Sequence, residues 1–109
     1  VTLTIEDVNG NIDSVTASVT VLDTVRPNVL ANDTTIYLDV NGMASMTAIG
    51  LDDGSSDTCG ILTRSIDSTN FDCSEIGANT VTLTIEDVNG NIDSTTATVT
   101  VIDALKRDV

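Results

Sequence analysis

A stretch of 23 residues occurs twice in this chain, and it constrains the fold more than any other feature. Residues 1–23 match residues 81–103 at 20 of 23 positions, with an offset of 80 residues. The three differences are conservative in a strand: Val15 for Thr95, Ser18 for Thr98 and Leu22 for Ile102. A long fixed period is typical of tandem modules, so we expect the chain to be a window on an array, starting partway through one module.

The repeated stretch has the alternation of a β-hairpin. Every second residue from Val81 to Ile85 and from Ala97 to Val101 is apolar, and the residues between them are mostly threonines. Period two with one apolar face predicts half-buried antiparallel strands. Residues 87–93 combine an Asn-Gly pair with several side-chain oxygens, which suits the connecting loop. We therefore predict a hairpin over residues 81–102, and the same hairpin over residues 1–22.

The residues between the two copies contain further strand signals separated by turns. Residues 34–38 and 43–48 flank an Asn-Gly pair and predict a second hairpin. A further strand is expected at 59–66 and a short one at 70–73. This pattern predicts an all-β fold, an immunoglobulin-like antiparallel β-sandwich in tandem repeats of 80 residues. The expected division is a C-terminal hairpin of a preceding repeat at 1–23, one complete repeat at 24–103, and the start of a linker at 104–109.

The composition excludes some partners and favours others. Seventeen acidic residues against four basic ones give a net charge of −13. A nucleic acid would be repelled by this charge, whereas divalent cations would be attracted to it. This segment contains no apolar stretch of the roughly 18 residues that a membrane span requires.

Two cysteines, Cys59 and Cys73, occur in a chain without histidine. We expect them to form a structural disulfide, whose loop closure would contribute about 3 kcal/mol in the chain-entropy model. A disulfide implies an oxidising, extracellular compartment. The alternative is a pair of free, buried thiols.

Oxygen-bearing side chains gather in loops that a sandwich would bring to one end. The linker carrying Asp23 should approach the acidic loop 51–57 and the turn of the second repeated hairpin. Calcium binds six to eight hard oxygen ligands, so we predict a Ca²⁺ site at the junction of two modules. The alternative is a set of solvated turns without a bound ion. The site would not be an EF-hand, because the glycine and glutamate spacing of that motif is missing. The predicted ligands are Asp23, Asp52, Asp53, Asp57, Asp87, Asn89 and Asn91.

The chain resembles the hyalin-repeat (HYR-type) and related immunoglobulin-like tandem repeats of bacterial surface proteins and adhesins. The residues that carry the resemblance are the Asp23…Pro27 junction, Leu38-Asp-Val-Asn-Gly42, Asp52…Asp57-x-Cys59-Gly60-Ile61, Phe71-Asp72-Cys73, Ile76-Gly77-x-Asn79-Thr80-Val81 and the second repeated stretch. The resemblance implies an extracellular, adhesion-linked spacer in a long array, without catalysis. Ala31 and Thr95 stand near positions where members of this family often carry a second cysteine pair.

Three classes of function follow. The first is a structural repeat of a filament, stalk or adhesin at the cell surface, whose partners are neighbouring repeats and other copies of the chain. In this first class, an upstream segment completes the module to which the hairpin at 1–22 belongs, or the hairpin completes a module of another copy by strand addition. The second is a module that binds glycans or another surface through its threonine-rich strand faces. The third, an enzyme, is not expected, because no nucleophile–base pair is present. Asn32-Asp-Thr34 is in addition a possible N-glycosylation site.

Overall fold

The second copy of the repeated stretch forms the central hairpin of the molecule. In the computed structural model, which describes residues 1–104, strand β7 spans Gly77–Asp87 and strand β8 spans Ile92–Ile102. The two strands pair antiparallel in continuous register from Gly77↔Val101 to Glu86↔Ile92. The structure therefore confirms the hairpin that the alternating pattern predicted.

Two further strands extend this hairpin into a four-stranded sheet with the order β3-β8-β7-β5. Strand β5 (Ile61–Ile66) pairs antiparallel with β7, whereas strand β3 (Thr34–Tyr37) pairs parallel with β8. An entirely antiparallel sandwich is therefore the wrong prediction at this edge. The reason is the direction of the linker, which reaches the module beside the β7–β8 turn, so that β3 runs in the same direction as β8.

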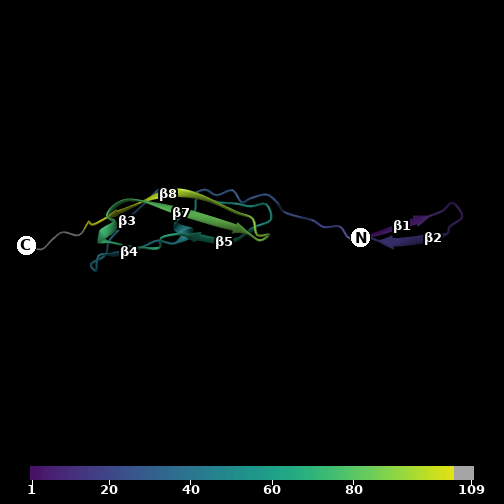
Figure 1. The fold of residues 1–109 in the computed structure, drawn as a ribbon, viewed down its shortest axis with the longest axis horizontal. Helices are drawn as coiled ribbons and strands as arrows, with labels where there is room; N and C mark the ends of the chain where they lie inside the picture. The colour runs from purple at the N-terminus through teal and green to yellow at the C-terminus, as the bar shows by residue number, and fades with distance from the viewer. Residues whose placement is uncertain (105–109) are drawn as a thin grey trace, which may run out of the picture.

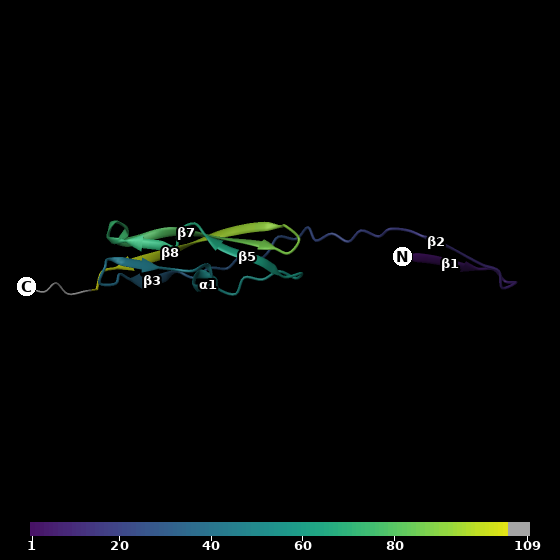
Figure 2. The ribbon, with the colours of Figure 1, turned by 90° about the horizontal axis from the view of Figure 1, so that it is seen from below.

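A second, smaller sheet lies against the first. Strand β4 (Met43–Ser45) pairs antiparallel with strand β6 (Asn70–Asp72). Between β4 and β5 lies helix α1 (Ala48–Leu51), and the short 3-10 helix η1 (Cys73–Glu75) follows β6. Figure 2 shows α1 on one side of the strands of the larger sheet. Helix α1 is a single turn, in agreement with the lack of helical periodicity in the sequence.

The strands on either side of the turn at residues 39–42 do not pair with each other. The turn itself forms, because Asp39 Oδ1 accepts hydrogen bonds from the amides of Asn41 (2.9 Å) and Met43 (3.0 Å). Beyond the turn, however, β3 joins β8 and β4 joins β6. The predicted hairpin over 34–48 is thus wrong in its pairing, since the turn carries the chain from one sheet to the other.

The core lies between the two sheets. The inward-facing residues of β7 and β8 alternate with outward threonines, as the period of two requires. The opposite layer contributes Phe71, the chain's only phenylalanine, which is 2% exposed. The buried apolar residues are Leu38, Met46, Leu51, Phe71, Val81, Leu83, Ile85, Ala97, Val99 and Val101.

The first copy of the repeat has the same local structure but no core to cover. Strands β1 (Thr2–Glu6) and β2 (Ile12–Thr16) pair in the register of their counterparts in β7 and β8. Leu3 and Ile5 are 60% and 64% exposed, however, whereas their counterparts Leu83 and Ile85 are 0% exposed. The predicted hairpin over 1–22 is confirmed only as far as Thr16.

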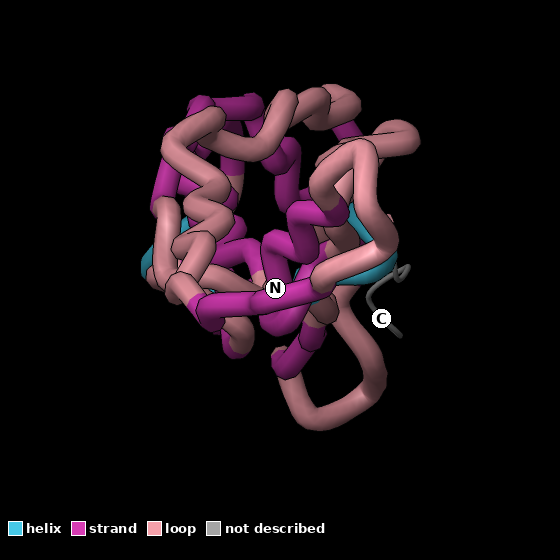
Figure 3. The backbone as a smooth tube through the Cα atoms, turned by 90° about the vertical axis from the view of Figure 1, so that its right-hand side faces the viewer, coloured by secondary structure: helices cyan, strands magenta, loops and turns pink. Residues whose placement is uncertain are grey.

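The hairpin β1–β2 stands apart from the module, at the end of an extended connection (Figure 1). The molecule measures 100 × 19 × 17 Å, and the view along its long axis shows how narrow it is (Figure 3). The described residues form an all-β fold, as the sequence predicted. Residues 105–109, which contain most of the expected linker at 104–109, lie outside the described part of the chain.

Candidate functional site

The connection between β2 and β3 comprises residues 17–33, and its part after Asp23 lies along the acidic loop of the module. Asn28 and Ser56 exchange backbone hydrogen bonds of 2.7 and 2.9 Å. The Ser55 hydroxyl accepts a hydrogen bond from the Leu30 amide (2.9 Å) and donates one to the Leu30 carbonyl (3.1 Å). This connection is therefore held by the module and is not a free tether.

Three turns of identical sequence, Asp-Val-Asn-Gly, fold in the same way at residues 7–10, 39–42 and 87–90. In each turn, Oδ1 of the aspartate accepts hydrogen bonds from the amides two and four residues later, at 2.8 to 3.0 Å. The glycines have φ values of 85°, 73° and 88°, a conformation that glycine adopts without steric cost. The local sequence thus shapes the turn. Asn11 and Asn91 add a side-chain hydrogen bond to Oδ2 of the aspartate, at 2.9 and 2.8 Å, which Met43 at the same position of the turn at 39–42 cannot make.

The turn at 87–90 differs from the other two because it meets the connection at Asp23. Asn91 Nδ2 donates hydrogen bonds to the Asp23 carbonyl and to Asp87 Oδ2, both at 2.8 Å. Asn89 Nδ2 donates to Asp23 Oδ2 at 3.1 Å. Burial raises the pKa of Asp87, but the hydrogen bonds from Asn91 and Asn89 outweigh it and hold this pKa below its ordinary value.

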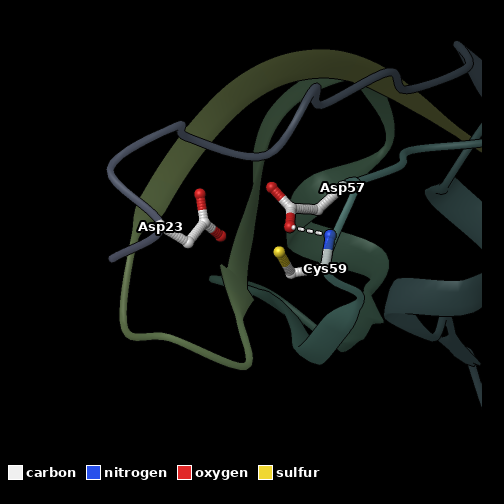
Figure 4. Close-up of side chains that lie close together, drawn as sticks. All are labelled: Asp23, Asp57 and Cys59. Atoms are coloured by element: carbon white, nitrogen blue, oxygen red, sulfur yellow. Dashed lines mark hydrogen bonds between the residues drawn. The ribbon is translucent and has the colours of Figure 1, made fainter. Parts of the chain in front are cut away.

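Asp57, at the end of the acidic loop, and Cys59, two residues after it, approach Asp23 (Figure 4). One oxygen of each carboxylate and the Cys59 Sγ all lie within 4.8 Å of one another. The Cys59 amide donates a hydrogen bond to Asp57 Oδ2 at 3.0 Å. Desolvation, reinforced by the negative charges of Asp23 and Asp57, raises the pKa of the Cys59 thiol, so this thiol is protonated at neutral pH.

We refer to these six residues as the junction cluster: Asp23, Asp57, Cys59, Asp87, Asn89 and Asn91. A groove of ≈ 560 Å³ opens beside the cluster, between the connection and the β7–β8 turn. Its lining includes Leu22, the counterpart of Ile102 at the end of β8, together with Thr58 and Val88. The end of the repeat thus lies directly against the module that follows it.

Five of the seven predicted calcium ligands gather in the junction cluster, and two do not. Asp52 Oδ2 instead accepts a hydrogen bond from Arg64 Nε at 2.8 Å, and Asp52 Oδ1 accepts one from the Ser55 amide at 3.0 Å. Burial raises the pKa of Asp52, but the contacts with Ser55 and Arg64 outweigh it and lower this pKa. The Asp53 side chain is exposed and lies outside the cluster.

The predicted disulfide between Cys59 and Cys73 is not formed, and both residues are free, exposed thiols. Cys59 lies two residues before Ile61, which pairs with Asp87 at one end of β7. Cys73 precedes Gly77 at the other end of β7 and lies against Gly42, with its Sγ 3.9 Å from the Gly42 carbonyl oxygen. An 11-residue strand is roughly 30 Å long, whereas a disulfide requires Cα atoms within about 7 Å.

Cys59 was not predicted to lie in the candidate site, because the expected disulfide accounted for it. Its position two residues after Asp57 was the available signal: a loop that brings Asp57 to the junction brings Cys59 there too. The possible glycosylation site Asn32 is exposed in the connection, and the Thr34 hydroxyl donates to its carbonyl oxygen at 3.3 Å.

The outward face of the main sheet carries hydroxyl groups in register. Thr80, Thr82 and Thr84 of β7 lie opposite Thr98, Thr96 and Ser94 of β8. Ser65 of β5 continues the row at Thr84. This face is the second candidate for a binding surface.

Chemically, the junction cluster offers hard carboxylate and amide oxygens to a cation, and amide N–H groups to carboxylates. No family model, curated protein or solved structure matches this chain. Within residues 1–104, no helix has the length and apolar character that crossing a membrane requires.

Proposed function

We propose that the chain is a structural repeat of an extracellular filament, stalk or adhesin, built from immunoglobulin-like modules related to the hyalin repeat. The observation that carries this proposal is the capture of Asp23, the last residue of the repeated stretch, by Asn89 and Asn91. Leu22 is the counterpart of Ile102, the last residue of β8. A preceding module would therefore end one residue before an anchored aspartate, and such a junction would be stiff.

The junction cluster is also the proposed calcium site. Asp23, Asp57 and Asp87 supply carboxylate oxygens, and amide oxygens and water complete the six to eight ligands that Ca²⁺ requires. The thiol of Cys59 is too soft a ligand for Ca²⁺, so it would lie beside the ion. Extracellular calcium modules bind at about 10⁻⁴–10⁻³ M, which the concentration outside cells satisfies. The cysteines are free thiols, so the argument for an extracellular location from a disulfide no longer applies. The extracellular assignment therefore depends on this cation site and on the net charge of −13.

A thermal melt in the presence of calcium, then of excess chelator, tests the cation site. Ligand at about 100 times its dissociation constant adds roughly 2.7 kcal/mol to the unfolding free energy. We expect a rise of several degrees in Tm with Ca²⁺, lost in Asp23→Ala and in Asp57→Ala. The matched control is Asp53→Ala, an exposed acid of the same loop, which should keep the full rise.

Two results of this melt would count against the calcium site. An unchanged Tm means that the junction is held by the amide hydrogen bonds alone. A rise with Zn²⁺ but not with Ca²⁺, abolished by Cys59→Ser, means that the cluster is a thiolate site for a softer ion.

The exposed apolar face of hairpin β1–β2 requires a partner that covers it. Its counterpart is covered by the rest of the module, so a preceding segment of similar sequence would cover it in an array. Alternatively, it completes a module of another copy by strand addition, which would build head-to-tail polymers. Size-exclusion chromatography over a range of concentrations separates the two: only the second arrangement produces oligomers of this chain.

A second candidate function is adhesion to a carbohydrate or another ordered surface through the outward threonines of the main sheet. The observation in favour is the register of hydroxyl groups across β7 and β8. Strands are about 4.8 Å apart and alternate residues about 6.7 Å apart, so these hydroxyls form a regular grid. Binding to an insoluble polysaccharide should then fall in the double variant Thr82→Val/Thr96→Val, and binding that persists would exclude this face.

A further inference from the structure

We propose that the three Asn-Gly pairs of this chain are sites of spontaneous deamidation and that Asp23 selectively protects one of them, Asn89. The pairs occupy turns of identical sequence and identical backbone hydrogen bonding. They differ in the side-chain amide, which in Asn89 is held by the Asp23 carboxylate. Loss of the Asn89 amide therefore requires the junction to open first.

The reaction needs only the chain and water. The backbone nitrogen of the following glycine attacks Cγ of the asparagine and forms a five-membered succinimide. The bond from Cγ to Nδ2 breaks, and ammonia leaves with the proton that the glycine nitrogen gives up. Water then opens the ring at either carbonyl, which yields aspartate or isoaspartate. The balance is one amide and one water consumed, one carboxylic acid and one ammonia formed.

The three turns share the geometry that the reaction requires, and the contact with Asp23 is made at one of them. Each following glycine lacks a Cβ that would hinder attack, and its amide donates to the aspartate carbonyl at 3.1, 3.0 or 3.3 Å. Asn9, Asn41 and Asn89 are all exposed. At Asn89, however, Nδ2 lies 3.1 Å from Asp23 Oδ2. This bond to a charged acceptor must break before the amide can rotate toward the Gly90 nitrogen.

The consequence for the junction rests on the proposed function. Deamidation of Asn89 replaces a hydrogen-bond donor by a carboxylate beside Asp23, in a cluster that already holds Asp57 and Asp87. Without a cation, the new charge would repel Asp23 and prevent the junction from closing again. The change would be irreversible, so each junction that opens for long enough would stay open.

The wild-type chain contains its own matched controls. Residues 1–14 and 81–94 are identical, so Asn9 and Asn89 have the same sequence around them. Asn41 lies in the same folded module as Asn89 but does not face Asp23. Asn11 and Asn91, each followed by isoleucine, serve as slow references.

The experiment is incubation of the full chain in warm, mildly alkaline buffer with chelator, followed by peptide mapping with isoaspartate assignment. Cleavage after Arg64 separates the peptides of Asn9 and Asn89, and fragment ions locate Asn41. We expect Asn89 to react about tenfold more slowly than Asn9 and Asn41. A tenfold ratio corresponds to about 1.4 kcal/mol, the low end for a hydrogen bond to a charged group. Asp23→Ala should bring Asn89 to the rate of Asn41, whereas Asp53→Ala should not.

Each other outcome overturns the proposal. Equal rates at all three sites exclude protection, and the absence of product at Asn9 excludes reactive turns. Slow reaction at both Asn41 and Asn89, with fast reaction at Asn9, assigns the effect to the rigidity of the module. Because the incubation contains chelator, a calcium melt without response refutes the cation site while leaving this inference intact.

Discussion

Asp87 and Asp7 are the same residue of the same turn in two surroundings, and this pair isolates what burial adds to a carboxylate. At Asp87, burial is the largest effect and raises the pKa, but the hydrogen bonds from Asn91 and Asn89 lower it overall. At Asp7, the hydrogen bonds from Asn11 and Asn9 lower the pKa against a smaller effect of desolvation. A carboxylate with a depressed folded-state pKa stabilises the fold above its unfolded pKa, near 4, and loses this contribution as pH falls through the folded value.

We therefore expect the unfolding free energy of the module to fall as the pH is lowered below about 4. Asp87→Asn should lower stability at neutral pH and flatten this acid dependence, because Asp87 accepts three hydrogen bonds within the folded module. Urea titrations at several pH values measure both effects. Asp7→Asn is the control, and an equally large loss in that variant would contradict the distinction.

For single residues, the candidate site could be predicted where it depends on turn sequences. It could not be predicted where it depends on contacts between residues far apart in the sequence. The amides of Asn89 and Asn91 follow from the turn sequence, and their approach to Asp23 follows from chain direction. Asp52 was misplaced because its partner Arg64 lies 12 residues away on β5, and no local pattern marks that ion pair. The cysteine pairing failed for a similar reason: sequence separation says nothing about which end of β7 each residue reaches.

At the scale of elements, the two hairpins show that alternation determines a local structure but not its environment. Strands β1 and β2 share their register with the matching parts of β7 and β8, yet their apolar faces are exposed. The sequence pattern predicted both hairpins for this reason. It did not predict the parallel β3–β8 pair or the separation of β3 from β4, because those depend on which sheet offers an edge.

The same substitution in the two hairpins should therefore have different effects. Ile85→Ala removes a side chain that is 0% exposed, and a buried Ile→Ala change typically costs about 2–5 kcal/mol of unfolding free energy. Ile5→Ala, at 64% exposure, should leave the module's stability nearly unchanged. Chemical denaturation of the two variants measures the difference. A comparable loss in Ile5→Ala would show that β1 packs on something in solution, as hairpin exchange between copies requires.

At the scale of the whole molecule, the chain is narrow, at 100 × 19 × 17 Å. An array of such repeats would be a stiff rod only if the junction between two repeats were rigid. In a chain with two complete repeats, the residue before Asp23 would be strand and Asp23 itself would be held by Asn89 and Asn91, so no residue is left to act as a hinge. Small-angle X-ray scattering should then give the narrow distance distribution of a rod.

Asn91→Ala in the second repeat removes the hydrogen bonds to Asp23 and to Asp87, and should broaden that distribution and shorten the mean end-to-end distance. The matched control is the same change at the Asn91 position of the first repeat, which faces no aspartate of a preceding module in this two-repeat chain. If both variants scatter like the parent, the amide contacts do not set the stiffness, and contacts across the groove beside Leu22 and Val88 become the element to test.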